Sequence, residues 1–145
     1  MDSKEIDELI KEIALIVKGY SSLDEEFKDI TRLINAKRLL VGYSFRFSEV
    51  VGYALDEYNK GYNFRKRNTA ESKLIFMKDG DTASKAELKA ELKAYKFRVD
   101  EGESEALYRK VKSYFDTMRD AITSLTQDIS ILRKEYEDSR VHDNG

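Results

Sequence analysis

A chain of 145 residues has room for one domain, because most domains contain roughly 100 to 200 residues. The sequence contains no cysteine, which excludes disulfides, thiolate metal sites and cysteine nucleophiles. It also contains no proline, and 37% of its residues are charged. That composition is typical of long helices and rare in turn-rich β proteins, so we expect an all-α protein with a thin core.

The first predicted element is a helix over residues 3–18. Asp2 and Glu5 have the spacing of a capping box, and apolar residues then recur every three or four positions from Ile6 to Tyr20. The acidic residues in this segment are unlike a signal peptide, and the sequence has no apolar run of the roughly 20 residues that span a bilayer. We therefore expect a soluble protein of the cytoplasm, with no membrane partner.

A second, longer helix is predicted from about residue 23 to residue 77. Ser22 and Glu25 form another capping-box pattern at its start. Tyr43, Phe45 and Phe47 alternate as they would in a strand, but no turn signal divides the segment and a lone strand has no partner. One continuous helix is the simpler interpretation.

A turn over residues 79–84 and a third helix over about residues 85–140 complete the prediction. Asp79 and Gly80 provide a stop signal, and Thr82 or Ser84 provides the next helix start. Gly102 is the expected position of a kink, and residues 141–145 are expected to be disordered. The apolar seam of this helix comprises Leu88, Leu92, Tyr95, Val99, Leu107, Val111, Tyr114, Met118, Ile122, Leu125, Ile129, Leu132 and Tyr136.

The predicted fold is an elongated antiparallel helical hairpin, similar to a coiled coil, with an additional N-terminal helix in one domain over residues 1–140. The seam from residue 107 onward is longer than a two-helix hairpin can cover, so either the first helix or another subunit must cover the rest. We favour a homo-oligomer. The predicted oligomerisation residues are Leu107, Val111, Tyr114, Met118, Ile122, Leu125, Ile129, Leu132 and Tyr136.

Little in the sequence points to catalysis. The one histidine, His142, lies in the predicted disordered tail, which removes the usual general base. There is no glycine-rich phosphate loop, nucleophile elbow or zinc-ligand spacing. We therefore predict that the protein is not an enzyme and uses neither a metal nor a cofactor.

A basic and aromatic cluster near the middle of the chain is the strongest functional signal. Residues 37–78 contain nine cations and four anions, although the whole chain has a net charge of -2. Cations neutralise phosphates and aromatic rings stack on unpaired bases, so the cluster predicts binding of single-stranded nucleic acid. The alternative interpretation is structural: Tyr58 and Tyr62 belong to the apolar seam of the helix, and the cations form an ordinary polar face beside them. The predicted binding residues are Arg46, Tyr58, Lys60, Tyr62, Phe64, Arg65, Lys66, Arg67 and Lys73.

The segment ALYRKVKSYFDTMRDAITSLTQDISILRKEYE in the last third, together with the expected helix–turn–helix arrangement, resembles the UvsY recombination-mediator family of tailed phages. The resemblance covers Leu33 to Tyr136 and rests on pattern rather than on a diagnostic motif. It implies a DNA-binding accessory protein that oligomerises through its last helix. In a phage-infected bacterium, such a protein would help a recombinase to displace a single-strand-binding protein and load on single-stranded DNA.

A different class of function also fits the sequence. The chain could be a coiled-coil interaction protein, either an inhibitor of a host defence complex or a structural component of the virion. In that case the basic cluster would contact an acidic protein surface. A regulatory adaptor that makes no contact with nucleic acid is a third interpretation.

Overall fold

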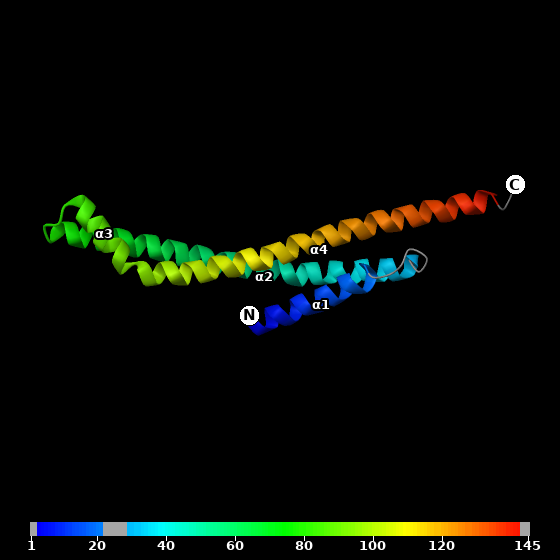
Figure 1. Cartoon of the computed structure of the whole chain (residues 1–145), viewed down its shortest axis with the longest axis horizontal. Helices are drawn as coiled ribbons and strands as arrows, with labels where there is room; N and C mark the ends of the chain where they lie inside the picture. The colour runs from blue at the N-terminus through cyan, green and yellow to red at the C-terminus, as the bar shows by residue number, and fades with distance from the viewer. Residues whose placement is uncertain (1–2, 22–28, 143–145) are drawn as a thin grey trace. The chain divides into compact units, whose positions relative to one another are not determined.

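The protein is all-α. The computed structural model describes residues 3–21 and 29–142, and these form four helices (Figure 1). They are α1 (Ser3–Ser21), α2 (Ile30–Lys78), α3 (Ala83–Lys93) and α4 (Tyr95–His142). The predicted helical hairpin is confirmed, because α2 packs against α4. The chain divides into two compact units: unit 1 comprises Met1–Val50 and Ser113–Gly145, and unit 2 comprises Val51–Lys112.

The start of α2 differs from the predicted start. Asp29 precedes the helix, and its Oδ1 accepts a hydrogen bond of 3.0 Å from the backbone N–H of Thr31. The Asp29 carbonyl also accepts the first intrahelical bond, from Leu33, so Asp29 is the N-cap. The predicted capping pair of Ser22 and Glu25 lies outside the described residues. At the other end of the chain, α4 continues to His142, where a disordered tail was expected.

The turn between α2 and α3 matches its prediction. The backbone N–H of Asp81 donates to the Phe76 carbonyl, and that of Gly80 donates to the Met77 carbonyl. These two bonds define a Schellman motif, in which the residue after the helix needs a left-handed conformation. Gly80 supplies it, with φ of +93°. Thr82 is the N-cap of α3 by its extended backbone, although its side chain makes no capping hydrogen bond.

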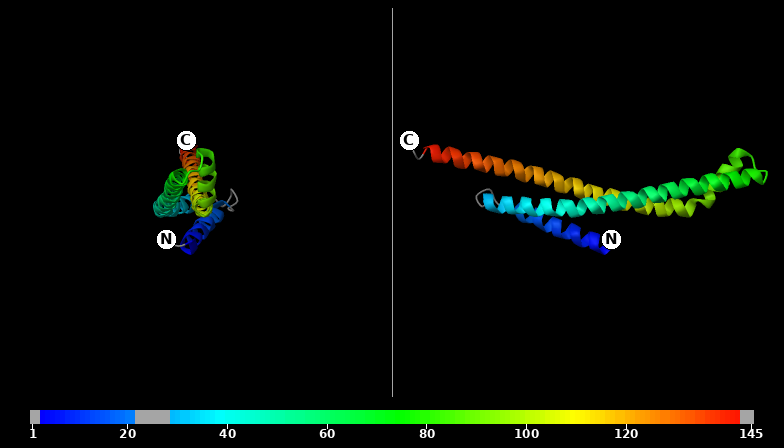
Figure 2. Two further views of the ribbon diagram at one scale, coloured as in Figure 1. Left: turned by 90° about the vertical axis from the view of Figure 1, so that its left-hand side faces the viewer. Right: turned by 180° about the vertical axis from the view of Figure 1, so that it is seen from behind.

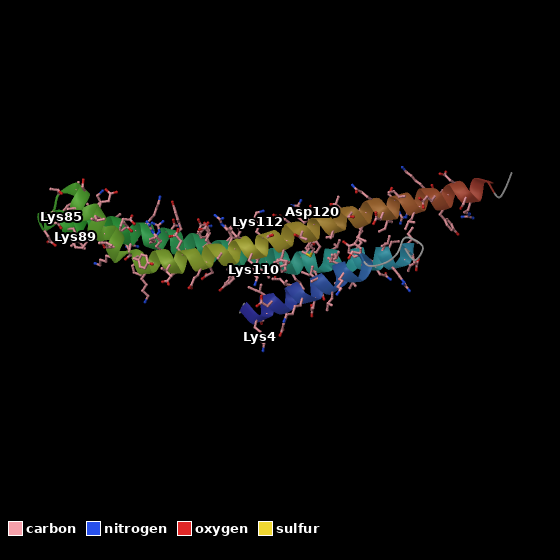
Figure 3. The ribbon with its side chains drawn as sticks, in the orientation of Figure 1. Lys4, Lys85, Lys89, Lys110, Lys112 and Asp120 are labelled. Atoms are coloured by element: carbon pink, nitrogen blue, oxygen red, sulfur yellow. The ribbon has the colours of Figure 1, made fainter. Side chains whose placement is uncertain are left out.

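A carboxylate fixes this turn to the helix that follows. The side chain of Asp81 accepts hydrogen bonds from Lys89, at 2.5 Å, and from Lys85, at 3.1 Å. Figure 3 shows both lysines on α3 beside the turn. These hydrogen bonds lower the pKa of Asp81 below its usual value, and the bond from Lys89 has the larger effect.

In unit 2, a different face of α3 is buried from the one that the sequence predicted. The alanines at 86, 90 and 94 are 0%, 0% and 3% exposed, and Ser72 of α2 is also buried. The predicted seam residues Leu88, Leu92, Tyr95 and Val99 are instead 64%, 70%, 67% and 44% exposed. Small side chains allow two helices to approach closely. The alanine face therefore packs inward, and the chain itself does not bury these four seam residues.

The predicted third helix is interrupted, but not at Gly102. The break falls at Ala94, which separates α3 from α4, and α4 runs through Gly102 without interruption. Helical hydrogen bonds nevertheless flank the break, from Ala94 to Ala90 and from Arg98 to Ala94. The chain therefore leaves the helical conformation at Ala94 and not at Gly102, because a glycine lowers helix stability without breaking the helix.

In unit 1, three helices share one core. Figures 1 and 2 show α1 lying alongside the first part of α2. Its buried residues Ile6, Leu9 and Ile13 follow the predicted spacing of three and four. Buried side chains from α2 and α4 complete this core, namely Leu33, Leu40, Phe47, Val50, Met118, Ala121, Leu125 and Ile129. No helix in the described ranges is both long enough and apolar enough to cross a membrane.

Candidate nucleic-acid interface

Most cations of the predicted binding cluster are neutralised within the chain. Lys60 Nζ lies 2.6 Å from a carboxylate oxygen of Asp56, and it also contacts Glu57. Arg67 pairs with Glu71 at 2.7 Å, one helical turn away. A phosphate would have to compete with these carboxylates, which lowers the cluster's attraction for nucleic acid below that suggested by its formal charge.

Lys73, another cation of the cluster, forms an ion pair with Glu87 that joins two helices. Lys73 Nζ of α2 donates to Glu87 of α3 at 2.7 Å. This hydrogen bond lowers the pKa of Glu87. Lys73 therefore helps to fix α3 against α2 and has a structural role beside the predicted one.

Arg65 lies between the helices of unit 2 rather than on its surface. Its guanidinium donates from Nε and Nη2 to the two carboxylate oxygens of Glu101, a residue 36 positions away on α4. The two side chains are only 15% and 11% exposed. The hydrogen bond to Glu101 raises the pKa of Arg65. α2 and α4 lie close together here: a Cβ at position 61 would lie 3.6 Å from the Glu101 Cα, which is an ordinary van der Waals contact.

The aromatic residues of the cluster contact other side chains of unit 2. Tyr58 stacks on Tyr108 of α4, with ring planes 2° apart and centroids 6.2 Å apart. Phe64 makes an edge-to-face contact with Phe97 at 5.0 Å. The Tyr62 ring lies 4.9 Å from Lys66 Nζ and 5.6 Å from the Arg65 guanidinium. Lys66 contacts this ring and has no carboxylate partner among the described residues.

α2 has a second basic surface, in unit 1, of which only one residue, Arg46, was predicted from the sequence. Arg32, Arg38, Leu39, Phe45 and Arg46 are all exposed, and they recur at six- and seven-residue intervals on one face of α2. We call these five residues the arginine stripe. The stretch from Ile30 to Ser48 contains four cations and no carboxylate. That absence of acids is the sequence signal that could have located the stripe, and of its members only Arg46 was predicted.

The arginines of the stripe have different surroundings. Arg32 and Arg38 form no ion pair within the described part of the chain. The Arg46 guanidinium lies 6.0 Å from the Tyr43 ring centroid and borders a groove of about 250 Å³, with Glu5, Glu8, Glu12 and Glu49 in its lining. A hydrogen bond to Glu12 raises the pKa of the nearby Tyr43 hydroxyl. One end of the stripe therefore faces the acidic side of α1.

The predicted oligomerisation residues lie largely within the chain's own core. Val111, Met118, Leu125 and Ile129 are buried. Leu107, Ile122 and Leu132 are partly buried, whereas Tyr114 and Tyr136 are exposed. The chain itself thus covers most of the seam that was expected to require another subunit. Self-association through this seam remains a prediction.

The described ranges show no candidate metal centre. They contain no group of three or more histidine or carboxylate side chains arranged to hold a metal ion. No protein-family model matches the chain, and no curated protein or solved structure matches it either.

Proposed function

We propose that the protein is a non-enzymatic accessory protein that binds single-stranded nucleic acid. The observation that carries this proposal is the arginine stripe of α2, in which Arg32 and Arg38 have no carboxylate partner in the described structure and Phe45 is 72% exposed. The stripe replaces the central cluster as the principal contact surface, because most cations of that cluster are already paired.

The chemistry of the stripe suits an unpaired strand better than a duplex. Guanidinium groups neutralise phosphates and release their counterions, whatever the base sequence. An exposed aromatic ring adds a surface on which a base can stack, and bases within a duplex are not available for such stacking. Lys66 and Tyr62 in unit 2 offer a smaller combination of the same kind.

The resemblance to the UvsY family gives this activity a biological context. On that basis, the protein acts in recombination or replication of a phage, in the cytoplasm of the infected bacterium. It helps a recombinase to load on single-stranded DNA that carries a single-strand-binding protein. This role requires no turnover, which agrees with a sequence that has no cysteine, glycine-rich phosphate loop, nucleophile elbow or zinc-ligand spacing.

Salt-titrated binding of a fluorescent oligothymidine tests the proposal. Replacing Arg32 and Arg46 with alanine should weaken binding and flatten the slope of log affinity against log salt by about 1.4, which is about 0.7 for each lost phosphate contact. Phe45→Ala should weaken binding by about 1 to 3 kcal/mol through lost stacking and leave the slope unchanged. Both changes are at exposed positions, so the fold should persist.

Two matched variants distinguish the possible surfaces. Lys11→Ala with Lys93→Ala removes the same charge from exposed positions outside the stripe. If this control weakens binding as much as the stripe variant does, binding follows net charge and the stripe is not the site. If only Lys66→Ala with Arg67→Ala abolishes binding, the central cluster is the interface after all.

A second candidate function is a helical interaction protein, and one observation favours it. The exposed residues Leu88, Leu92, Tyr95 and Val99 follow a spacing of four, three and four, which is the pattern of a coiled-coil seam. We call these four residues the outer seam. A seam of this kind without a partner helix is a surface for another chain.

A further inference from the structure

Unit 1 contains an open groove between α2 and α4. Its volume is about 620 Å³, and its lining includes Ile34, Lys37, Arg38, Val41, Ile129 and Arg133. Ile129 is buried and forms part of the floor, whereas Arg38 and Arg133 are exposed. The groove therefore combines an aliphatic floor with three cations and has no carboxylate in its lining.

A second hollow of about 680 Å³ continues from the first, because both have Arg133 in their lining. Its apolar lining residues are Ile30 of α2 together with Leu132 and Tyr136 of α4, and its lining also includes the carboxylates of Asp29 and Glu137. The cations without a carboxylate beside them are therefore those of the first hollow. Along α4, the apolar residues 129, 132 and 136 are three and four positions apart. This spacing places the three side chains on one face of α4, so that they form a continuous apolar strip along the two hollows.

The cations of the groove are available to a ligand. Lys37, Arg38 and Arg133 form no ion pair with any residue that the structure describes. This distinguishes them from Lys60, Arg67 and Lys73 of unit 2, which all contact carboxylates. Unpaired cations beside an apolar floor favour an occupant that has an apolar face and acidic flanks.

We propose that this groove binds an acidic amphipathic helix of a partner protein. A nucleic-acid strand fits less well, because the first hollow offers isoleucine and valine and has no ring on which a base could stack. The acidic α1 of a second copy is also a poor occupant, since its apolar residues Ile6, Leu9 and Ile13 are already buried in its own chain. The groove and the arginine stripe share Arg38, but the inference also rests on Lys37, Arg133 and the aliphatic floor, which are not part of the stripe.

The test uses two synthetic 18-residue helical peptides that carry fluorescein. One has leucines spaced three and four residues apart with glutamates on both flanks, and the other has lysine in place of each glutamate. The native protein should bind the acidic peptide at least about tenfold more tightly than the basic one. Lys37→Glu with Arg133→Glu should reduce or reverse that preference. Arg38 is left unchanged because it belongs to both surfaces.

The controls make each outcome decisive. Lys11→Glu with Lys93→Glu changes the net charge equally at exposed positions elsewhere, and it should keep the preference for the acidic peptide. Arg32→Ala with Arg46→Ala should also keep it, even if DNA binding is lost. If the double charge reversal impairs folding, as judged by circular dichroism, Lys37→Gln with Arg133→Gln must still weaken the preference.

Three results would overturn the inference. The first is equal binding of both peptides to the native protein. The second is competition by oligothymidine together with loss of DNA binding in the groove variant, which would make the groove a nucleic-acid site. The third is a change of native mass in the groove variant, measured by light scattering, which would make the occupant a second copy of the chain.

Discussion

At the scale of single residues, the pairing of each cation determines its role. Arg65 and Arg67 are two positions apart in a basic run, yet Arg65 lies between helices and Arg67 lies on the surface. The partner of Arg65 is 36 positions away, so no local pattern in the sequence reveals it. The sequence could therefore identify which residues are charged, but it could not show which charges remain available to a ligand.

The buried pair leads to a stability prediction. Glu101→Ala leaves the Arg65 guanidinium without its carboxylate in a site where both side chains are mostly shielded from water. A lost hydrogen bond to a charged group costs about 1.5 to 3 kcal/mol, so the free energy of unfolding should fall by about 2 kcal/mol. Urea denaturation followed by circular dichroism measures the difference.

The matched control is Glu71→Ala, which breaks the exposed pair with Arg67. Water screens that pair, so its loss should have a much smaller effect on unfolding. Replacing both Arg65 and Glu101 with methionine should recover part of the lost stability, because no unpaired charge then remains between the helices. Equal effects of Glu101→Ala and Glu71→Ala would contradict the structural role of the buried pair.

At the scale of secondary-structure elements, the turn after α2 was easier to predict than the buried face of α3. The turn after α2 was predictable because Asp79 and Gly80 form a local signal that needs no tertiary information. The buried face of α3 was not predictable, because α3 has two apolar faces, one with alanines and one with leucines. Hydrophobicity favours the leucines, whereas the close approach of α2 favours the alanines.

Two glycines in unit 2 give an element-scale prediction. An added methyl group would meet open space at both Gly52 and Gly80, but only Gly80 has a positive φ. Gly80→Ala should therefore lower the free energy of unfolding by about 1 to 2 kcal/mol, the cost of a left-handed alanine. Gly52→Ala lies within α2 and should raise it by about 1 kcal/mol. Thermal unfolding of the two variants should shift in opposite directions.

Shifts of the same sign in the two glycine variants would contradict this prediction. A stabilising Gly80→Ala would show that the Schellman turn is not maintained in solution. A destabilising Gly52→Ala would show that the exposed face of α2 at this position contacts another chain. The second result would be informative, because glycine is otherwise unfavourable within a helix.

At the scale of the whole molecule, a count of charges does not show which cations are unpaired. Residues 37–78 have a formal charge of +5, but Lys60, Arg65, Arg67 and Lys73 are all paired with carboxylates. The unpaired cations described above are mainly in unit 1, on the arginine stripe and around the groove. A sum of charges along the sequence cannot distinguish these cases, because helix packing determines which acids meet which bases.

The exposed apolar residues point to a different surface for self-association from the one that the sequence predicted. The residues predicted to bind another subunit are largely buried within the chain, whereas the outer seam is exposed. Completely burying one such side chain stabilises an assembly by about 1.5 to 3 kcal/mol, and two copies would contribute eight side chains. Association costs about 4 to 15 kcal/mol, so pairing through the outer seam can yield a modest net affinity. We therefore expect self-association that mass measurements can detect.

Leu92→Glu with Val99→Glu tests whether the outer seam is the contact. Both side chains are exposed, so the variant should remain helical while its mass, measured by light scattering, falls to the monomer value of 16.8 kDa. Ile122→Glu with Ile129→Glu should instead unfold unit 1, because Ile129 is buried in its core. A native protein that stays monomeric at high micromolar concentration would rule out self-association. If the Leu92/Val99 variant keeps the native mass, the contact lies elsewhere. If the Ile122/Ile129 variant stays helical but dissociates, the oligomerisation residues predicted from the sequence form the subunit interface.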